Sequence, residues 1–191
     1  MDIIIQLNPE EFDLISACIN NERWAQKRLY EEHYSQMMAL SMRYAGNNDD
    51  ALDILHEGFI KVFKNLYKYQ ARTSVNAWIR KIIVNTAIDF YRKDIKRRSE
   101  ELDAAKHVSS NIPDALSNLS SEEILKALQL LPYSYRSVFN MFVIEGYSHK
   151  EIAEMLGINE STCRSNLVKA RTKLKQILLA TDSDFNERKK V

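Results

Sequence analysis

The chain has 191 residues, of which 45% are hydrophobic and 28% charged, and its formal net charge is +1. This composition is typical of a folded globular protein and excludes a wholly disordered chain. With only 4 glycines and 3 prolines, the sequence has too few turn residues for a sandwich or barrel. The length predicts one domain or two small ones.

The cysteines and the N-terminus bear on the cellular compartment. Cys18 and Cys163 lie far apart and form no disulfide framework. The N-terminus shows no secretory signal, and no apolar run approaches the roughly 20 residues of a membrane helix. We therefore expect a reduced, cytoplasmic protein without membrane insertion.

The sequence offers little that would support enzymatic chemistry. Its four histidines and two cysteines show no zinc-ligand spacing. It contains no glycine-rich phosphate loop and no evident pairing of nucleophile and base. We expect no metal site, no catalytic residues and no cofactor, and an enzyme is the least favoured class.

Charge is unevenly distributed along the chain. Residues 1–60 carry a net charge of −7, and residues 99–125 carry −5. Three basic stretches contrast with them: 61–77 at +4, 78–98 at +5, and 161–175 at +5 without an acid. The first two stretches are contiguous and form one basic block, and residues 161–175 form a second. Two separated basic blocks in a near-neutral protein predict two local sites for a polyanion. For either block alone, a solvated helix face is an equally good interpretation.

Helical signals dominate the N-terminal half. Asn8-Pro9-Glu10-Glu11 is typical of a helix start. Apolar residues at helical spacing predict a helix over 22–45, ended by Gly46-Asn47-Asn48, and a second, strongly amphipathic helix that begins at Asp49-Asp50. Residues 67–75 form a basic, aromatic loop, and a long helix follows from about Ser74 to Lys96.

The C-terminal half has separate helix signals. Ser120 and Glu123 can form a capping box, and helices are expected over 121–130, 133–145, 148–156 and 160–179. Residues 97–119 are polar and acidic and lack an apolar face. The fold class is therefore all-α: two helical modules, 1–96 and 120–180, are joined by a flexible acidic linker, 97–119, and followed by a tail, 181–191.

The C-terminal module contains a helix-turn-helix pattern. Ser148 and Glu151 form a second capping box, and Gly157 suits the left-handed residue that ends a short helix. Asn159 can cap the next helix, which places Cys163, Leu167 and Leu174 inward and cations outward. A basic second helix of this kind fits the major groove of DNA. A helical hairpin that binds nothing is the alternative.

The long helix of the N-terminal module mixes aromatic, cationic and amide side chains. Trp78, Arg80, Asn85, Arg92 and Lys93 form a set that suits single-stranded or opened DNA, because cations contact phosphates and aromatic rings stack on bases. For Trp78 itself a core position is the favoured interpretation. The preceding stripe around Asp53 is also expected to pack inward, although it could dock a partner helix.

Together these motifs resemble the sigma-70 family of bacterial sigma factors, in its extracytoplasmic-function (ECF) group. The motifs, in chain order, are Asp50-Ala51-x-Asp53-Ile54, Phe59-Ile60-x-Val62-Phe63, Trp78-Ile79-Arg80-x-Ile82-x-x-Asn85-x-x-Ile88-Asp89-x-x-Arg92, Leu131-Pro132, Tyr147-Ser148-x-x-Glu151-Ile152-Ala153-x-x-Leu156-Gly157, and Ser161-Thr162-x-Arg164-Ser165-x-Leu167-x-x-Ala170-Arg171. Each motif alone is modest, but their order and spacing are highly specific.

The resemblance implies a transcription initiation factor rather than an enzyme. Its first module would be sigma region 2, which binds the β′ clamp of RNA polymerase and melts the −10 promoter element. Its second would be sigma region 4, which reads the −35 element and touches the β flap. The implied partners are polymerase core and promoter DNA, and the family also admits an anti-sigma factor.

The resemblance also implies residue roles. The polymerase-binding residues would be Asp50, Asp53, Ile54, His56, Glu57, Phe59 and Ile60. The −10 element would be bound by Tyr67, Lys68, Arg72, Trp78, Arg80, Asn85, Arg92 and Lys93. The −35 element would be bound by Ser161, Thr162, Arg164, Ser165, Asn166, Val168, Lys169 and Arg171.

Some positions depart from the family pattern. His56 stands where the family usually has Gln, so a polymerase contact there is expected to be altered or pH-sensitive. Asn166 and Val168 replace a cation or a bulkier residue, so the −35 sequence cannot be transferred from relatives, and Asn166 could bind adenine. A stand-alone helix-turn-helix regulator and a sigma-like decoy for an anti-sigma factor stay open as alternative functions.

Overall fold

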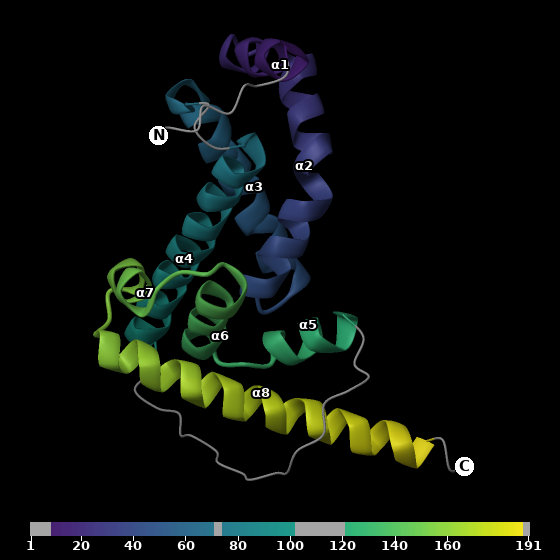
Figure 1. The fold of residues 1–191 in the computed structure, drawn as a ribbon, viewed down its shortest axis with the longest axis vertical. Coiled ribbons are helices and arrows are strands. Elements are labelled where there is room, and N and C mark those ends of the chain that lie inside the picture. Colours follow the sequence, from purple (N-terminus) through teal and green to yellow (C-terminus); the bar gives the residue numbers. More distant parts are fainter. Residues whose placement is uncertain (1–8, 71–73, 102–120, 189–191) are drawn as a thin grey trace, which may run out of the picture. The chain divides into compact units, whose positions relative to one another are not determined.

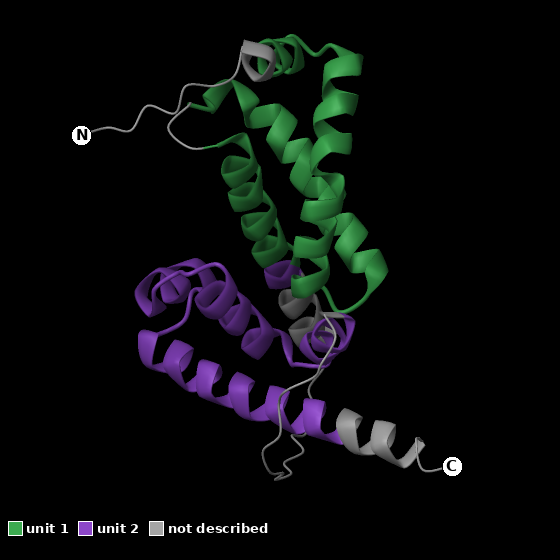
Figure 2. Ribbon diagram, turned by 45° about the vertical axis from the view of Figure 1, so that its right-hand side comes forward, with its two compact units in different colours: residues 1–90 green, residues 91–191 purple. Residues whose placement is uncertain are grey.

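The computed structural model describes residues 9–70, 74–101 and 121–188, and the described residues are helical with short connections (Figure 1). They fall into two compact units, which divide between Phe90 and Tyr91 (Figure 2). The expected all-α class with two helical modules is confirmed.

Unit 1 is built from four α-helices and a short 3-10 turn. Their bounds are α1 (Pro9–Ile19), α2 (Arg23–Tyr44), α3 (Asn48–Asn65), η1 (Leu66–Lys68) and α4 (Val75–Glu101), of which only residues 75–90 belong to unit 1. Asn47 begins α3 by accepting a hydrogen bond from the Asp50 N–H at 2.8 Å. This cap satisfies one of the amides that a helix start leaves without an internal partner.

The core of unit 1 comes from the apolar stripes that the sequence predicts. Leu29, Met37, Leu40 and Tyr44 of α2 are all buried, as are Leu55 and Val62 of α3. α3 and α4 approach closely at Gly58, where an added Cβ would lie 2.3 Å from Ile83 Cδ1. A glycine in the middle of a helix lowers helix propensity, so its role here is to let α4 pack against α3.

Unit 2 contains α5 (Ser121–Gln129), α6 (Tyr133–Phe139), the π-helical segment η2 (Asn140–Ile144), α7 (His149–Leu156) and α8 (Glu160–Arg188). α5, α6 and α7 all pack against α8. One cluster of buried side chains joins α5 to α8 and consists of Ala127, Leu128, Leu131, Ala170, Leu174 and Leu178. A buried stripe along α8 thus organises this unit.

Two of the expected boundaries are corrected. α4 continues to Glu101, so residues 97–101 are helical and do not belong to the expected linker. α8 continues to Arg188, well past the expected end at 179. Both extensions lack glycine and proline, the two residues that most disfavour a helix interior, so an established helix can propagate through them. Residues 102–119 of the expected linker lie outside the described residues, as do Ser120 and Asn8.

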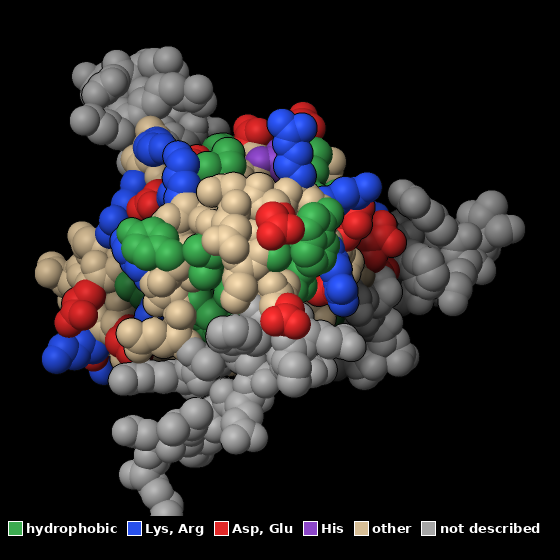
Figure 3. Space-filling view, turned by 90° about the horizontal axis from the view of Figure 1, so that it is seen from above, with side chains coloured by type: hydrophobic (Ala, Val, Ile, Leu, Met, Phe, Trp, Pro, Cys, Tyr) green, Lys and Arg blue, Asp and Glu red, His purple; other side chains and the backbone are tan. Residues whose placement is uncertain are grey.

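The exposed surface of unit 1 is mixed in character. Trp24 and Ile60 are 56% and 53% exposed, although both are large and hydrophobic. Figure 3 shows one face of the molecule, on which hydrophobic side chains form separate patches among basic and acidic ones. None of the helices that the structure describes is both long enough and apolar enough to span a membrane.

Both cysteines are buried and unbonded, which leads to a testable expectation. Burial, and to a lesser degree the charge of Glu32, raises the pKa of Cys18 from 9.0 to about 11. Burial also raises the pKa of Cys163. Because the thiolate is the reactive species, we expect a disulfide reagent at pH 8 to label the native thiols slowly and the denatured thiols fast.

The same shift predicts how stability depends on pH. The fold favours the neutral Cys18 thiol, so its contribution is complete below about pH 9 and is lost between about pH 9 and the folded-state pKa of about 11. Denaturation at several pH values should show this decline, and replacing Cys18 by alanine should remove it. Rapid labelling of Cys18 in the native protein would contradict the expectation.

Candidate nucleic-acid and polymerase interfaces

The polymerase-binding residues expected from the sequence divide into an exposed and a buried set along α3. Asp53, His56 and Ile60 are exposed, and we call these three residues the α3 outer face. Asp50 and Glu57 are half-buried beside them. The side chains of Ile54 and Phe59 are each 2% exposed. Because they are buried in the core of unit 1, Ile54 and Phe59 position α3 and are not available to touch a partner.

Aromatic rings from α2 support the α3 outer face. The Tyr30 ring lies 4.7 Å from the Phe59 ring and 6.5 Å from the His56 ring, measured between centroids. Burial, followed by the neighbouring Tyr34, raises the pKa of Tyr30, so its phenol stays protonated at neutral pH. The result is a surface of one carboxylate, one imidazole and apolar groups on a rigid helix.

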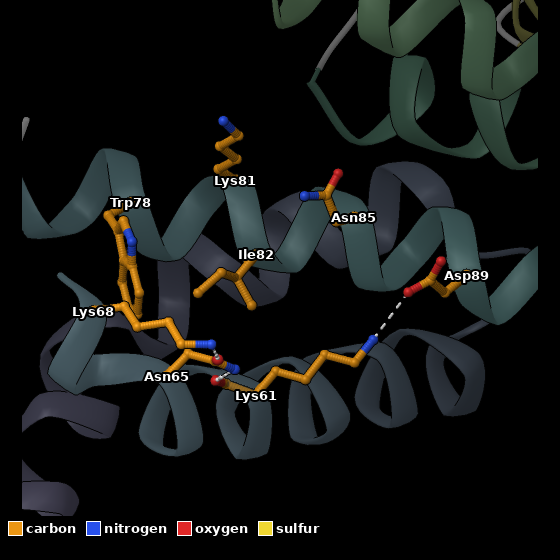
Figure 4. A pocket seen from close by; sticks show the side chains of 8 residues that line it. All are labelled: Lys61, Asn65, Lys68, Trp78, Lys81, Ile82, Asn85 and Asp89. Atoms are coloured by element: carbon orange, nitrogen blue, oxygen red, sulfur yellow. Dashed lines mark hydrogen bonds and ion pairs between the residues drawn. The ribbon is translucent and has the colours of Figure 1, made fainter. Parts of the chain in front are cut away.

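A pocket of about 460 Å³ opens between α3 and α4. We call it the α3–α4 pocket, and its lining consists of Lys61, Asn65, Lys68, Trp78, Lys81, Ile82, Asn85 and Asp89. Figure 4 shows Ile82 between the two helices, with Trp78 and Lys68 toward one end and Lys61 reaching across to Asp89 at the other. An aromatic ring, amides and cations thus surround one apolar floor.

Ion pairs and hydrogen bonds make the two ends of this pocket different. Lys61 Nζ lies 3.1 Å from Asp89 and 3.5 Å from Glu57, so two carboxylates neutralise it. Lys68 Nζ donates to the Asn65 side-chain oxygen at 3.1 Å and forms no ion pair with an acid in the described part of the chain. Among the described residues, Lys81 has no ion-pair partner. Positive charge is therefore concentrated at Lys68 and Lys81, nearer the Trp78 end.

Only some of the residues expected to bind the −10 element line this pocket. Lys68, Trp78 and Asn85 line it, and Trp78 packs edge-on against Tyr69 at 5.6 Å. Trp78 is half-buried, so the core position favoured from the sequence is replaced by a position on the pocket wall.

The other expected −10 residues lie elsewhere. Tyr67 is 64% exposed on η1, Arg80 is half-buried, and both lie outside the pocket lining. Arg92 and Lys93 are exposed further along α4, and Arg72 lies outside the described residues.

Sequence reasoning missed several residues of the pocket. Lys61, Asn65, Lys81 and Asp89 were not assigned to it, although both lysines were counted in basic blocks and Asp89 stands in a family motif. A one-turn spacing places Lys61, Asn65 and Lys68 along one side of α3 and η1, which was the available signal. The pairing of Lys61 with Asp89, 28 residues away, had no local signal.

The helix-turn-helix of unit 2 follows its sequence signals closely. The Ser148 hydroxyl accepts the Glu151 N–H, and the Glu151 carboxylate accepts the Ser148 N–H at 2.8 Å, which completes the capping box. The Ser148 hydroxyl also donates to the Glu151 carboxylate at 2.7 Å, and this hydrogen bond, followed by the one from the Ser148 N–H, lowers the pKa of Glu151. Gly157 ends α7 in the left-handed conformation, at a φ of 67°.

The two helices meet through small and medium side chains. Ile152 and Ala153 of α7 are buried, as are Cys163 and Leu167 of α8. His149 Nδ1 lies 3.4 Å from Cys163 Sγ. The inward placement of Cys163 and Leu167 leaves the opposite face of α8 open to solvent.

That outer face carries the residues expected to bind the −35 element. The exposed members are Ser161, Thr162, Arg164, Ser165, Val168, Lys169 and Arg171, and Asn166 is half-buried. Glu160, the first residue of α8, pairs with Arg164 one turn later. Sequence reasoning did not assign a role to Glu160. Among the described residues, no cluster of three or more histidine, cysteine or acidic side chains could hold a metal.

Two helical units, one with a cationic, aromatic pocket and one with a basic helix-turn-helix, are the architecture expected of a DNA-binding protein. Residues 29–98 match Sigma-70 region 2, and residues 121–174 match Sigma-70, region 4. The chain is 31% identical over 151 residues to the RNA polymerase sigma factor SigV of Bacillus subtilis, covering 79% of this chain and 89% of that protein.

Two further comparisons agree. The ECF RNA polymerase sigma factor SigM of Mycobacterium tuberculosis is 24% identical over 177 residues, or 93% of this chain and 89% of that protein. The sigma factor RpoE, solved with the anti-sigma factor NepR from Bartonella quintana, shares the fold with a TM-score of 0.51 at 21% identity, over 80% of this chain and 95% of that chain.

The chain therefore belongs to the sigma-70 family of RNA polymerase sigma factors and to its ECF group. It is a transcription initiation factor, with RNA polymerase core and promoter DNA as its partners. The resemblance drawn from the sequence motifs is confirmed.

Proposed function

We propose that three of the described surfaces each bind a different target during promoter recognition. The α3 outer face binds the polymerase clamp, the α3–α4 pocket receives an unpaired nucleotide of the −10 element, and α8 reads the −35 element. The protein acts in the cytoplasm and catalyses no reaction itself. The observation that carries this proposal is the pocket, which combines a stacking ring with unneutralised cations in one recess.

The chemistry of the pocket suits a nucleotide from an opened strand. Trp78 offers a flat face for a base, and Asn65 and Asn85 offer amide donors and acceptors for base edges. Lys68 and Lys81 attract the phosphates on either side. A volume of about 460 Å³ is ample for one nucleotide, and duplex DNA cannot enter a recess of that size, so the pocket selects melted DNA.

The proposed contact with the polymerase clamp is supported by which residues of α3 are buried and which are exposed. Ile54 and Phe59 anchor the helix in the core, which leaves Asp53, His56 and Ile60 exposed on its outer face. An exposed isoleucine flanked by polar groups is a typical anchor for a helical partner. An anti-sigma factor is a further proposed partner, supported by the fold shared with a sigma factor solved in such a complex.

Transcription in vitro tests the proposal directly. Core polymerase is incubated with and without this protein on a promoter library randomised around −35 and −10. We expect run-off transcripts enriched for one pair of elements. Sequence-specific duplex binding by the protein alone, without transcripts, would instead indicate a stand-alone regulator. Partner binding without either activity would indicate a decoy.

The lysines at the Trp78 end of the pocket should set the salt dependence of single-strand binding. Each phosphate contact contributes roughly 0.7 to the slope of log affinity against log salt concentration for a single strand. Lys68→Ala and Lys81→Ala are each expected to lower that slope by about 0.7. The measurement is holoenzyme affinity for a −10 single-strand oligonucleotide between low and moderate salt.

A matched control comes from α2. Lys27 is 74% exposed and lies outside the pocket lining, so Lys27→Ala should leave the slope unchanged. If Lys68→Ala and Lys81→Ala leave the slope at the value of the unmodified protein, as Lys27→Ala should, the pocket does not contact phosphate.

A further inference from the structure

The recognition helix begins with an ion pair that the function described so far does not use. The Glu160 carboxylate accepts a hydrogen bond from Arg164 Nη2, and the two side chains are 45% and 62% exposed. Residues 161–175 contain no acid, so Glu160 is a carboxylate directly before the basic stretch of α8. A carboxylate at this position reduces the non-specific attraction of the helix to DNA. Glu160 is therefore expected to have a role other than general DNA affinity.

The location of the pair is informative. In helix-turn-helix proteins the N-terminal residues of the second helix contact base edges in the major groove. Side chains on a helix lean toward its N-terminus, so Arg164 reaches back over the first turn, where Glu160 holds it. The carboxylate therefore directs the guanidinium toward the end of α8 that enters the groove, and away from the phosphates along its flanks.

The donors and acceptors of the pair match one base pair. Guanine presents two acceptors, O6 and N7, and its cytosine partner presents an amino donor. Arg164 keeps donors beyond the one given to Glu160, and Glu160 has only acceptors. The two side chains together thus present donors beside an acceptor, which is the complement of a G·C pair read from the major groove.

We propose that the Glu160–Arg164 pair reads a single G·C base pair of the −35 element, with Arg164 on guanine and Glu160 both orienting it and accepting from the cytosine amino group. This inference rests on the proposed −35 role of α8. It assigns Glu160 as a specificity-determining residue and restricts Arg164 to a base contact in place of a phosphate contact.

The test uses holoenzyme and a promoter library with a fixed −10 element and a randomised −35 element. Arg164→Ala is expected to reduce discrimination at one G·C position by roughly five- to 150-fold, the range for a bidentate contact. Glu160→Gln, which keeps size and shape, is expected to lower it several-fold at the same position only. The double variant should lose more than Arg164→Ala alone but less than the product of the two single effects, because Glu160 acts both through Arg164 and by its own contact to cytosine.

Salt dependence gives a second readout. Without its carboxylate partner, Arg164 is free to contact phosphate, so Glu160→Gln should steepen the salt slope of promoter binding by about one. A matched control is Glu122→Gln, because Glu122 pairs with Lys126 at 2.9 Å in the same one-turn geometry on α5. The control should change neither the preferred −35 sequence nor the salt slope.

Three outcomes would overturn the inference, and they are distinguishable. If Arg164→Ala leaves the −35 preference unchanged, both this inference and the proposed role of Arg164 in reading the −35 element are wrong. If Arg164→Ala has the expected effect but Glu160→Gln has none, Arg164 acts alone and only the inference fails. If Glu160→Gln weakens all −35 positions equally and lowers the melting temperature, Glu160 serves the helix and not the sequence preference.

Discussion

Replacing Trp78 by alanine is expected to slow promoter opening by roughly five- to 150-fold, because stacking a base on an aromatic ring contributes about 1–3 kcal/mol. Trp78 lines the α3–α4 pocket and is held edge-on by Tyr69, so its ring is oriented before DNA arrives. Alanine removes the stacking face and leaves the lysines in place. Binding to polymerase core and to the −35 element should persist, so the loss should be confined to the melting step.

The measurement is the rate at which −10 thymines become reactive to permanganate in the presence of holoenzyme. Trp78→Phe keeps a smaller aromatic face and should restore most of the rate. The chain has two tryptophans, so a Trp24→Phe background makes Trp78 the only indole reporter. Its fluorescence should be quenched by a −10 single strand. Unchanged fluorescence with a normal opening rate for Trp78→Ala would show that bases stack elsewhere.

Replacing Arg136 by alanine is expected to lower the free energy of unfolding of unit 2 by about 2–4 kcal/mol. Arg136 is 6% exposed, and its Nη2 donates to the carbonyl oxygens of Gln129 at 3.1 Å and Leu131 at 3.0 Å. These bonds join the end of α5 to α6. Hydrogen bonds from charged donors contribute about 1.5–3 kcal/mol each, and buried carbonyls that lose their donor are left desolvated.

Hydrogen exchange in the full chain measures this effect, since it resolves the amides of each unit. Protection should fall across α5, α6 and α8 and stay constant in unit 1. Arg171→Ala is the matched control, because Arg171 is an exposed arginine of the same unit and its loss should cost no more than about 0.5 kcal/mol. The Arg136→Ala protein should still bind polymerase core while losing −35-dependent transcription. Equal protection in both variants would contradict the assigned role of Arg136.

The sequence by itself determined the features that depend on neighbours one or two turns away. The stop after α2, the Asn47-capped start of α3, the capping box of Ser148 with Glu151 and the left-handed Gly157 all follow from local rules of helix ends. Helical periodicity likewise identified the buried stripe of α2 and the inward residues of α8. The ordered set of motifs was enough to indicate the family.

Only the tertiary structure decided whether a motif residue is buried in the core or exposed to a partner. Ile54 and Phe59 belong to family motifs, yet they are buried, whereas their immediate neighbours Asp53 and Ile60 are exposed. The α3–α4 pocket likewise depends on Gly58 admitting α4 and on Lys61 meeting Asp89 across 28 residues. Periodicity defines the faces of one helix, but the partner of each face is set by packing between segments far apart in the chain, which no local pattern encodes.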